Sequence, residues 1–301
     1  MGRTRSARAH RQPAGHAGAR SPVRTERLTA LVRRCAVPFL LAATAAALFG
    51  AVLYGTVRTR LSLGEPSLVS GYALLALALL LAAFNLRKRL NPVARAPAAS
   101  WKRLHVVGGS LALALFWLHV GAFWPIGPYE RALAVLFYGV TASGLFGYAC
   151  QQFYPRRLAQ TGVEVIFERV PDEIAALRER AEAAVLACTE THHSNTLARF
   201  YVETFQWFFR KPRFLLSHLW GGQRAAYWVA QQLTSARRYL GPKEHAYLDE
   251  LGDLAHAKAR LDLHYAVQGL LKIWLHVHVP VAAGMLVLAL WHTLIVNIYR
   301  L

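Results

Sequence analysis

The chain is poor in cysteine and in acidic residues, and each shortage narrows the classes of protein that it fits. Only three cysteines occur in 301 residues, at positions 35, 150 and 188. They support no disulfide framework. The sequence also has no Cys-x-x-Cys-His segment for covalent haem attachment and no paired cysteines at a zinc or iron–sulfur spacing.

Acidic residues number 16 against 35 lysines and arginines, which gives a formal net charge of +19. Such a charge is typical of nucleic-acid-binding proteins, but here the basic residues cluster beside apolar stretches. Anionic lipid headgroups and the preference for basic residues on the cytoplasmic side of a membrane account for that placement. We therefore expect a lipid bilayer as a partner and no nucleic acid.

Charged residues are nearly absent from several long stretches of the sequence. About 20 apolar residues are enough for a helix to cross a bilayer. Five stretches approach this length and predict membrane spans: Ala36 to Val57, Leu68 to Phe84, Leu104 to Trp124, Ala132 to Gln151, and Leu270 to Ile298.

Basic residues predict the orientation of these spans. The N-terminal arm holds nine arginines and a single acid, Glu26. The connection between the second and third spans is also basic, with Arg87, Lys88, Arg89, Arg95, Lys102 and Arg103. Both segments are expected on the cytoplasmic side of an inner (plasma) membrane. A cleaved signal peptide is the competing interpretation of the N-terminus, but the first apolar stretch exceeds the usual signal core.

The predicted fold is an all-α integral membrane protein, a five-span helical bundle with an α-helical cytoplasmic insertion before the last span. Residues 1–34 form a basic, disordered cytoplasmic arm, and residues 35–151 hold spans one to four. Residues 152–268 form the insertion, and residues 269–301 hold span five. Within the insertion, helices are expected over Pro171–Cys188, Thr196–Phe209, Arg224–Leu240 and Lys243–Tyr265.

Four histidines stand in two of the apolar spans as two pairs, His105 with His119 and His278 with His292, and each pair is fourteen positions apart. Fourteen helical residues make roughly 3.9 turns, so the members of a pair share one face within about 40°. They lie roughly 21 Å apart along the helix axis. Imidazole is a recurrent axial ligand of haem, and ionisable side chains at membrane depth are costly unless they serve a function.

The third and fifth spans run in the same direction in a five-span chain. His105 then lies at the depth of His278 on the cytoplasmic side, and His119 lies at the depth of His292 on the outer side. The sequence therefore predicts two haem b groups, each with two histidine ligands to its iron. His276 is the rival of His278, but it lies sixteen positions from His292, which turns it by roughly 160° to the opposite face.

Cationic and small residues beside these histidines fit the same prediction. Candidates for contacts to haem propionates are Lys102, Arg103, Lys272 and Arg131. Topology and snorkelling also explain these four cations, and for each residue taken alone that interpretation is favoured. The small residues either give a flat cofactor clearance or allow close helix packing, and the two interpretations stay open. They are Gly108, Gly109, Gly121, Gly139, Ser143, Gly144, Gly147 and Gly284.

The spacing of His105 to His119 and of His278 to His292 resembles that of di-haem b-type membrane cytochromes. It is similar in particular to the ferric reductase-like transmembrane domain of ferric reductases and NADPH oxidases. The cytochrome b of quinol-oxidising complexes shares the spacing. The resemblance covers roughly residues 101–151 and 270–298 and implies transmembrane electron transfer. Electron donor and acceptor proteins or a quinone would be partners, and the chain would be a membrane subunit of an oxidoreductase system.

Two departures separate the chain from that family. The flavin and nicotinamide module expected after the last span is missing from the sequence, and neither glycine pair has a dinucleotide-binding setting. The long insertion is the second departure. Two alternative functions are a histidine-dependent metal or proton transporter and a non-redox membrane anchor for a cytoplasmic partner.

An aromatic belt in the insertion has two equal interpretations, a helix in the lipid headgroup region or an ordinary core. Its members are Phe200, Tyr201, Phe205, Trp207, Phe208, Phe209, Phe214, Trp220, Tyr227 and Trp228. The histidines of the insertion show no ligand spacing, and Asp249, Glu250, Asp253 and Asp262 are expected to pair with Lys258 and Arg260 or to meet a redox partner.

Overall fold

The computed structural model describes the backbone of residues 22–83 and 98–299, and the side chains of residues 36–83 and 100–299. All of the regular structure in these ranges is helical, as the sequence predicts. Residues 1–21 of the predicted arm lie outside the described residues, whereas the backbone of residues 22–34 is helical rather than disordered. The cations Arg87, Lys88, Arg89 and Arg95 and the side chain of Cys35 also lie outside the described residues. The chain divides into two compact units, Met1–Ala122 and Phe123–Leu301.

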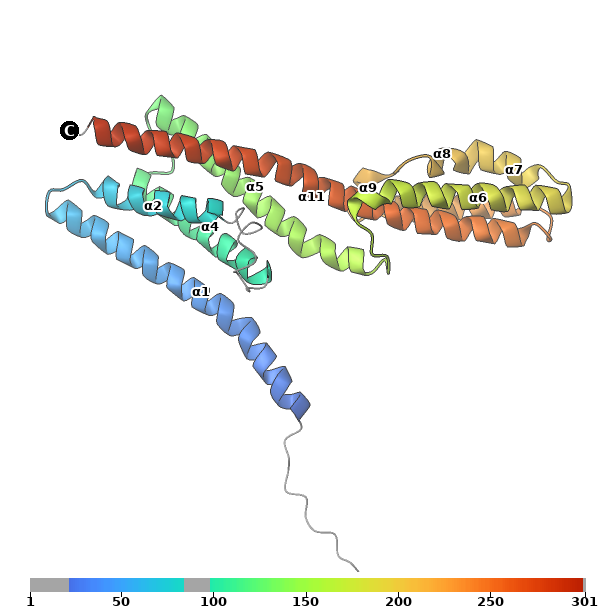
Figure 1. The fold of residues 1–301 in the computed structure, drawn as a ribbon, viewed down its shortest axis with the longest axis horizontal. Coiled ribbons are helices and arrows are strands. Elements are labelled where there is room, and N and C mark those ends of the chain that lie inside the picture. Colours follow the sequence, from blue (N-terminus) through green and yellow to red (C-terminus); the bar gives the residue numbers. More distant parts are fainter. Residues whose placement is uncertain (1–21, 84–97, 300–301) are drawn as a thin grey trace, which may run out of the picture. The chain divides into compact units, whose positions relative to one another are not determined.

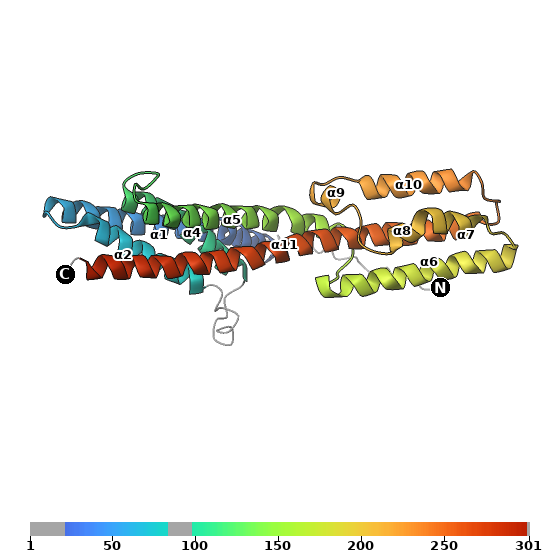
Figure 2. The same ribbon diagram turned by 90° about the horizontal axis from the view of Figure 1, so that it is seen from above.

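The described residues of the first unit form three helices that pack on one another: α1 (Pro22–Leu61), α2 (Pro66–Ala82) and α4 (Ala98–Val120) (Figures 1 and 2). Pro66 occupies the first turn of α2, where its missing N–H costs nothing. Small residues allow close approach here. A Cβ atom on Gly108 of α4 would lie 2.9 Å from Leu81 of α2, so this glycine serves helix packing.

The second unit is built along α11, a single helix of 54 residues from His245 to Ile298. Its C-terminal half packs against α5 (Pro128–Ala159), and its N-terminal half lies among shorter helices (Figure 1). The helix continues through residues 268 and 269, where the sequence suggests a boundary between insertion and span. Pro280 lies inside α11 without ending it. At about 1.5 Å per residue the helix is roughly 80 Å long, far more than a bilayer needs.

The shorter helices and the N-terminal half of α11 (residues 245–269) form what we call the insertion bundle. The predicted helix over Thr196–Phe209 is confirmed, but its middle turn is a π-helix. The predicted starts at residues 171 and 224 agree with the structure to within one residue. The elements of the bundle before α11 are η2 (Phe167–Arg169), α6 (Val170–His192), α7 (Thr196–Phe200), η3 (Tyr201–Phe205), α8 (Gln206–Phe209), α9 (Leu215–Leu219) and α10 (Arg224–Arg237).

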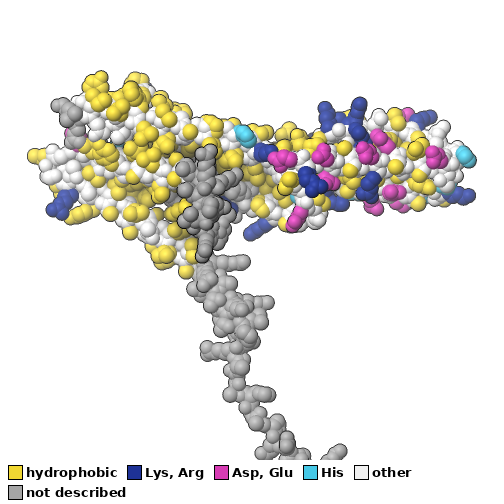
Figure 3. Space-filling view, in the orientation of Figure 1, with side chains coloured by type: hydrophobic (Ala, Val, Ile, Leu, Met, Phe, Trp, Pro, Cys, Tyr) yellow, Lys and Arg dark blue, Asp and Glu magenta, His cyan; other side chains and the backbone are white. Residues whose placement is uncertain are grey.

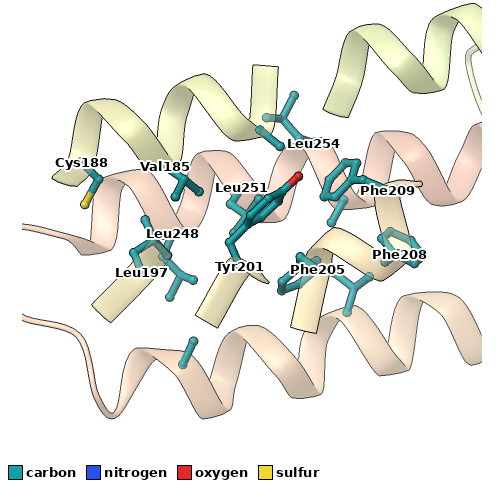
Figure 4. Packing of buried hydrophobic residues seen from close by; sticks show 14 of the residues in the cluster. Val185, Cys188, Leu197, Tyr201, Phe205, Phe208, Phe209, Leu248, Leu251 and Leu254 are labelled. Carbon is teal, nitrogen blue, oxygen red and sulfur yellow. The ribbon is translucent and has the colours of Figure 1, made fainter. Parts of the chain in front are cut away.

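Aromatic and aliphatic side chains fill the core of the insertion bundle (Figure 4). Phe205, Phe208 and Phe209 are fully buried, and leucines of α11 pack against them. The core interpretation of the aromatic belt is therefore correct for these residues. Trp220 and Tyr227 differ, since they remain 88% and 71% exposed.

Apolar surface and charge separate along the second unit. On the face shown in Figure 3, acidic and basic side chains gather over the insertion bundle, whereas apolar side chains cover the C-terminal half of α11. Four helices in the described part of the chain contain a stretch long and apolar enough to cross a membrane, at Ala36–Leu61, Ser100–Val120, Pro128–Ala159 and His245–Ile298. The apolar α2 is shorter, with 17 residues, so the structure supports four candidate spans rather than the predicted five.

Candidate functional site

His119 lies near the C-terminal end of α4, and its ring contacts the first turn of α2. Its Nδ1 atom is 3.0 Å from the carbonyl oxygen of Ser67 and 3.4 Å from Oγ of Ser70. A carbonyl oxygen can only accept, so Nδ1 carries the hydrogen and the lone pair of the ring lies on Nε2. A backbone carbonyl on one nitrogen is the usual arrangement for a histidine whose other nitrogen binds a metal.

The approach of His119 to α2 depends on a glycine. A Cβ atom on Gly71 would lie 2.9 Å from Cε1 and 3.1 Å from Nδ1 of His119. Real Cβ atoms are not found this close to other atoms, so a side chain here would push the ring away from Ser67. His105 lies fourteen positions earlier on the uninterrupted α4 and is half-buried.

His278 on α11 packs against α5. Its Nδ1 atom is 3.1 Å from Oγ of Ser143, and its ring stacks on Trp274 with 5.3 Å between ring centroids. Trp274 in turn donates its Nε1 hydrogen to the carbonyl oxygen of Ser143, at 2.8 Å, and its ring packs directly over Gly147. Trp274 thereby holds the ring of His278 against α5.

His292 also lies beside α5, fourteen residues after His278 on α11. Its ring stacks on Tyr129 with 5.9 Å between centroids, and the hydroxyl of Tyr129 donates to the carbonyl oxygen of Leu288 at 2.8 Å. Tyr129 and Ser143 are themselves fourteen positions apart on α5. Helix α5 therefore supplies neighbours for His278 and His292 at the same spacing as the two histidines. The sequence alone does not reveal this match, because α5 and α11 are far apart along the chain.

His276 has a different environment from His278. Its side chain is exposed, and its Nδ1 atom lies 2.8 Å from the carbonyl oxygen of Lys272, one turn back on its own helix. The sequence predicts that His276 lies on another face from His292, and these contacts agree with that placement.

The four cations that sequence analysis assigns to propionates divide into two groups. Lys272 pairs with Glu168 at 2.5 Å and lies over the ring of Phe167, and Arg131 donates to the carbonyl oxygen of Pro125 at 3.2 Å. These two therefore have structural roles within the second unit. Lys102 is half-buried and Arg103 is exposed at the start of α4.

The glycines near the four histidines also differ in their surroundings. Gly108 and Gly147 provide close packing, against Leu81 and Trp274 respectively. Gly144 lies next to His278, whose Cε1 atom would be 3.7 Å from an added Cβ. An added Cβ would meet nothing within 4 Å at four other positions, Gly109, Gly121, Gly139 and Gly284. Close packing explains the glycines at positions 108 and 147. Clearance for a flat ligand stays a prediction for the four glycines with no atom near an added Cβ.

Charged side chains of the insertion bundle form one buried pair. Nζ of Lys258 donates to Oδ2 of Asp262 and to the carbonyl oxygen of Lys211, at 2.7 and 2.9 Å. Burial lowers the pKa of Lys258 and raises the pKa of Asp262, and the attraction between the two charges opposes both changes. The predicted pairing of Asp262 with Lys258 is confirmed, whereas Asp249 pairs with Arg237 of α10.

Among the described residues, no group of three or more histidine, cysteine or acidic side chains is placed to hold a metal ion. Comparisons of the chain with protein-family models, with curated proteins and with solved structures find no match. The class that the fold defines is an all-helical protein with long apolar helices suited to a membrane.

Proposed function

We propose that the chain is a b-type membrane cytochrome that carries electrons across a bilayer. His105 and His278 would bind the iron of one haem, and His119 and His292 the iron of a second. The observation that carries the proposal is the repeated fourteen-residue spacing of histidines on two long apolar helices.

The contacts of the histidines support this assignment. Ser67 and Ser143 each lie within hydrogen-bond distance of an Nδ1 atom, on His119 and His278 respectively. The Ser67 carbonyl oxygen leaves the lone pair of His119 on Nε2, and each contact fixes the rotation of its ring. These are the properties that an axial ligand requires, and they are costly to build at membrane depth without a use.

The protein supplies ligation, orientation and an apolar surrounding, and bound haem supplies the one-electron chemistry. Two imidazoles on one iron occupy both axial positions, which favours electron relay over binding of oxygen. The stacked rings of Trp274 and Tyr129 restrict the two histidines of α11. The electron donor is a quinol, a flavoprotein or a soluble carrier, and the acceptor is ferric iron or an external cytochrome.

The proposal also takes α2 as a fifth span in the plasma membrane. Its 17 residues give about 26 Å of helix, the lower limit for crossing the apolar layer. With the arginine-rich N-terminus in the cytoplasm, α4 and the C-terminal half of α11 cross in the same direction. That direction pairs His105 with His278 and His119 with His292, as in the ferric reductase-like domains that the spacing resembles.

Optical spectroscopy of the purified full-length protein tests the proposal. We expect a dithionite-reduced b-type spectrum and two haem b per chain by the pyridine haemochrome assay. Each of the single variants H105A, H119A, H278A and H292A should lose about one haem, because one imidazole holds iron far less tightly than two. The matched control is H276A, two residues from His278 on the same helix, which should retain both haems.

Two results would contradict the proposal. A colourless protein after expression with ample haem would exclude a cytochrome, and metal-dependent flux in vesicles would then favour the transporter. Equal haem loss in H276A and H278A would contradict the assigned ligands. Partner binding that survives loss of all four histidines, in a protein without haem, would favour the membrane anchor.

A further inference from the structure

A second candidate site lies in the insertion bundle, away from the four histidines. A pocket of about 420 Å³ opens between the C-terminal end of α5, the turn that joins α9 to α10, and α11. This volume falls within the usual range of small-molecule sites. All of its lining residues belong to the second unit.

The lining of this pocket is basic. Arg157 enters it from α5 and Arg260 from α11, together with His218 and His256. Its other lining residues are uncharged, and none is a carboxylate. Two guanidinium groups that share a pocket without acids repel each other, and an anion relieves that repulsion.

A second feature of this pocket is His218, which lines it from α9. Its side chain is only 8% exposed, and its Nε2 atom has no hydrogen-bond partner. A buried polar atom without a partner costs about 1 to 3 kcal/mol, and native proteins rarely leave one. The other strongly buried histidine of the bundle, His264, contacts Thr161 and Gln268. Of these two histidines, only His218 lines a pocket.

The turn between α9 and α10 brings backbone close to the two arginines. Gly221 has a φ of +81°, and a Cβ atom there would lie 3.8 Å from Nη1 of Arg157. A Cβ atom on Gly222 would lie 2.5 Å from Oγ of Ser217, so the tight turn requires glycine. The 14-residue α10 starts directly afterwards at Arg224, and the N–H groups of its first turn attract negative charge.

We propose that this pocket binds a phosphate group, as inorganic phosphate, a phosphate monoester or the headgroup of an anionic phospholipid. A tetrahedral oxyanion offers acceptors on all sides, which matches donors that arrive from α5, α9, α11 and the start of α10. Arginine forks suit phosphate geometry. Arg157 lies six residues past the apolar stretch of α5, about 9 Å along the helix, so lipid and soluble phosphate both reach it.

Binding measurements on the full-length protein test this proposal without reference to haem. We expect inorganic phosphate to raise the melting temperature in detergent, and R157Q/R260Q to weaken the half-maximal effect about tenfold or more. The single variant R260Q is included in case the double variant misfolds. Arg260 is exposed, and R260Q keeps the contact of Arg157 with the carbonyl oxygen of Leu219. The matched control R180Q/R238Q removes the same charge from exposed positions outside the pocket.

Nanodiscs with and without phosphatidylglycerol distinguish the two sources. The lipid headgroup is supported if the wild-type protein and R180Q/R238Q retain this lipid and R157Q/R260Q loses it. An effect of inorganic phosphate that persists in phosphatidylcholine supports a soluble ligand. The proposal is overturned if neither probe binds, if R180Q/R238Q weakens binding as much as R157Q/R260Q, or if acetate at equal ionic strength replaces phosphate.

Discussion

Nζ of Lys258 lies 2.7 Å from Oδ2 of Asp262, and both side chains are completely buried one helical turn apart on α11. Asp262 also accepts the backbone N–H of Arg213, at 3.2 Å, and Lys258 lies over the ring of Phe208. The pair thus joins α11 to the segment between α8 and α9. Its removal tests how the insertion bundle is held together.

Asp262→Ala should destabilise the bundle by about 3 to 5 kcal/mol, because it leaves a lysine buried without its counter-charge. The double change K258M/D262L should cost much less, since it removes both charges and keeps apolar volume. Thermal unfolding followed by circular dichroism measures both. The control is Glu173→Ala at the exposed Arg169–Glu173 pair, which should change stability by less than about 1 kcal/mol. Equal losses in the single and double variants would contradict this account.

His218 should make the insertion bundle less stable as the pH drops from about 6.5 to 4 in phosphate-free buffer. The raised pKa of Asp262 opposes this change, so the effect of His218 is the difference between the wild type and His218→Asn. Burial, Lys258 and Arg157 lower the pKa of His218 to about 4, whereas the unfolded chain has the ordinary value near 6.5. The unfolded state alone therefore takes up the proton in this window, which favours unfolding. His256 and Arg260 face the same pocket and add no negative charge.

Melting temperatures of the wild type and His218→Asn across pH 4 to 7 measure this effect. The wild type should lose a few °C more than the variant over this interval. His193→Asn is a suitable control, because that side chain is exposed. Parallel pH profiles of the wild type and His218→Asn would contradict the assignment.

Gly147→Ala should disturb the haem assigned to His278. The added methyl group would collide with the ring of Trp274, which stacks on His278. We expect reduced occupancy of one haem and a shifted reduced spectrum. Gly139→Ala on the same helix is the matched control, since an added Cβ there meets no atom within 4 Å. The same spectrum in both variants would show that the Trp274 ring does not position the ligand.

Ser143→Ala should lower the affinity for one haem by about 10- to 100-fold, the usual effect of losing a hydrogen-bond partner behind a metal-bound histidine. Haem titration of apoprotein measures this value. Ser110→Ala serves as control, because Oγ of Ser110 donates only to the carbonyl oxygen of Val106 on its own helix. An unchanged affinity in Ser143→Ala would remove this serine from the proposed site.

Helices were the part of the fold that local sequence could predict. The segment Thr196–Phe209 was correctly bounded, because its neighbours are polar or break helices. The π-helical turn at Tyr201–Phe205 was not predicted, since it follows from packing in the bundle core rather than from any local pattern. The continuity of α11 through residue 268 was missed because a change from charged to apolar residues does not interrupt helical hydrogen bonds.

The candidate sites show the same limit. Helical periodicity is enough to place His278 and His292 on one face of α11, but their neighbours Ser143 and Tyr129 lie more than a hundred residues away in the sequence. The pocket around His218 was missed entirely. His218 and His256 share no recognisable spacing, and Arg157 lies on α5, far from both in the sequence. Only the folded bundle brings these side chains together.

No turn interrupts α11 between Asp262, in the bundle, and His278, in the apolar half. A helix transmits torsion along its axis because each backbone N–H is tied to the carbonyl four residues earlier. Rotation of the bundle end of α11 by about 20° would therefore turn the imidazole of His278, which precedes Pro280, by a similar amount. A ligand or partner that turns the insertion bundle would therefore change the orientation of the His278 ring.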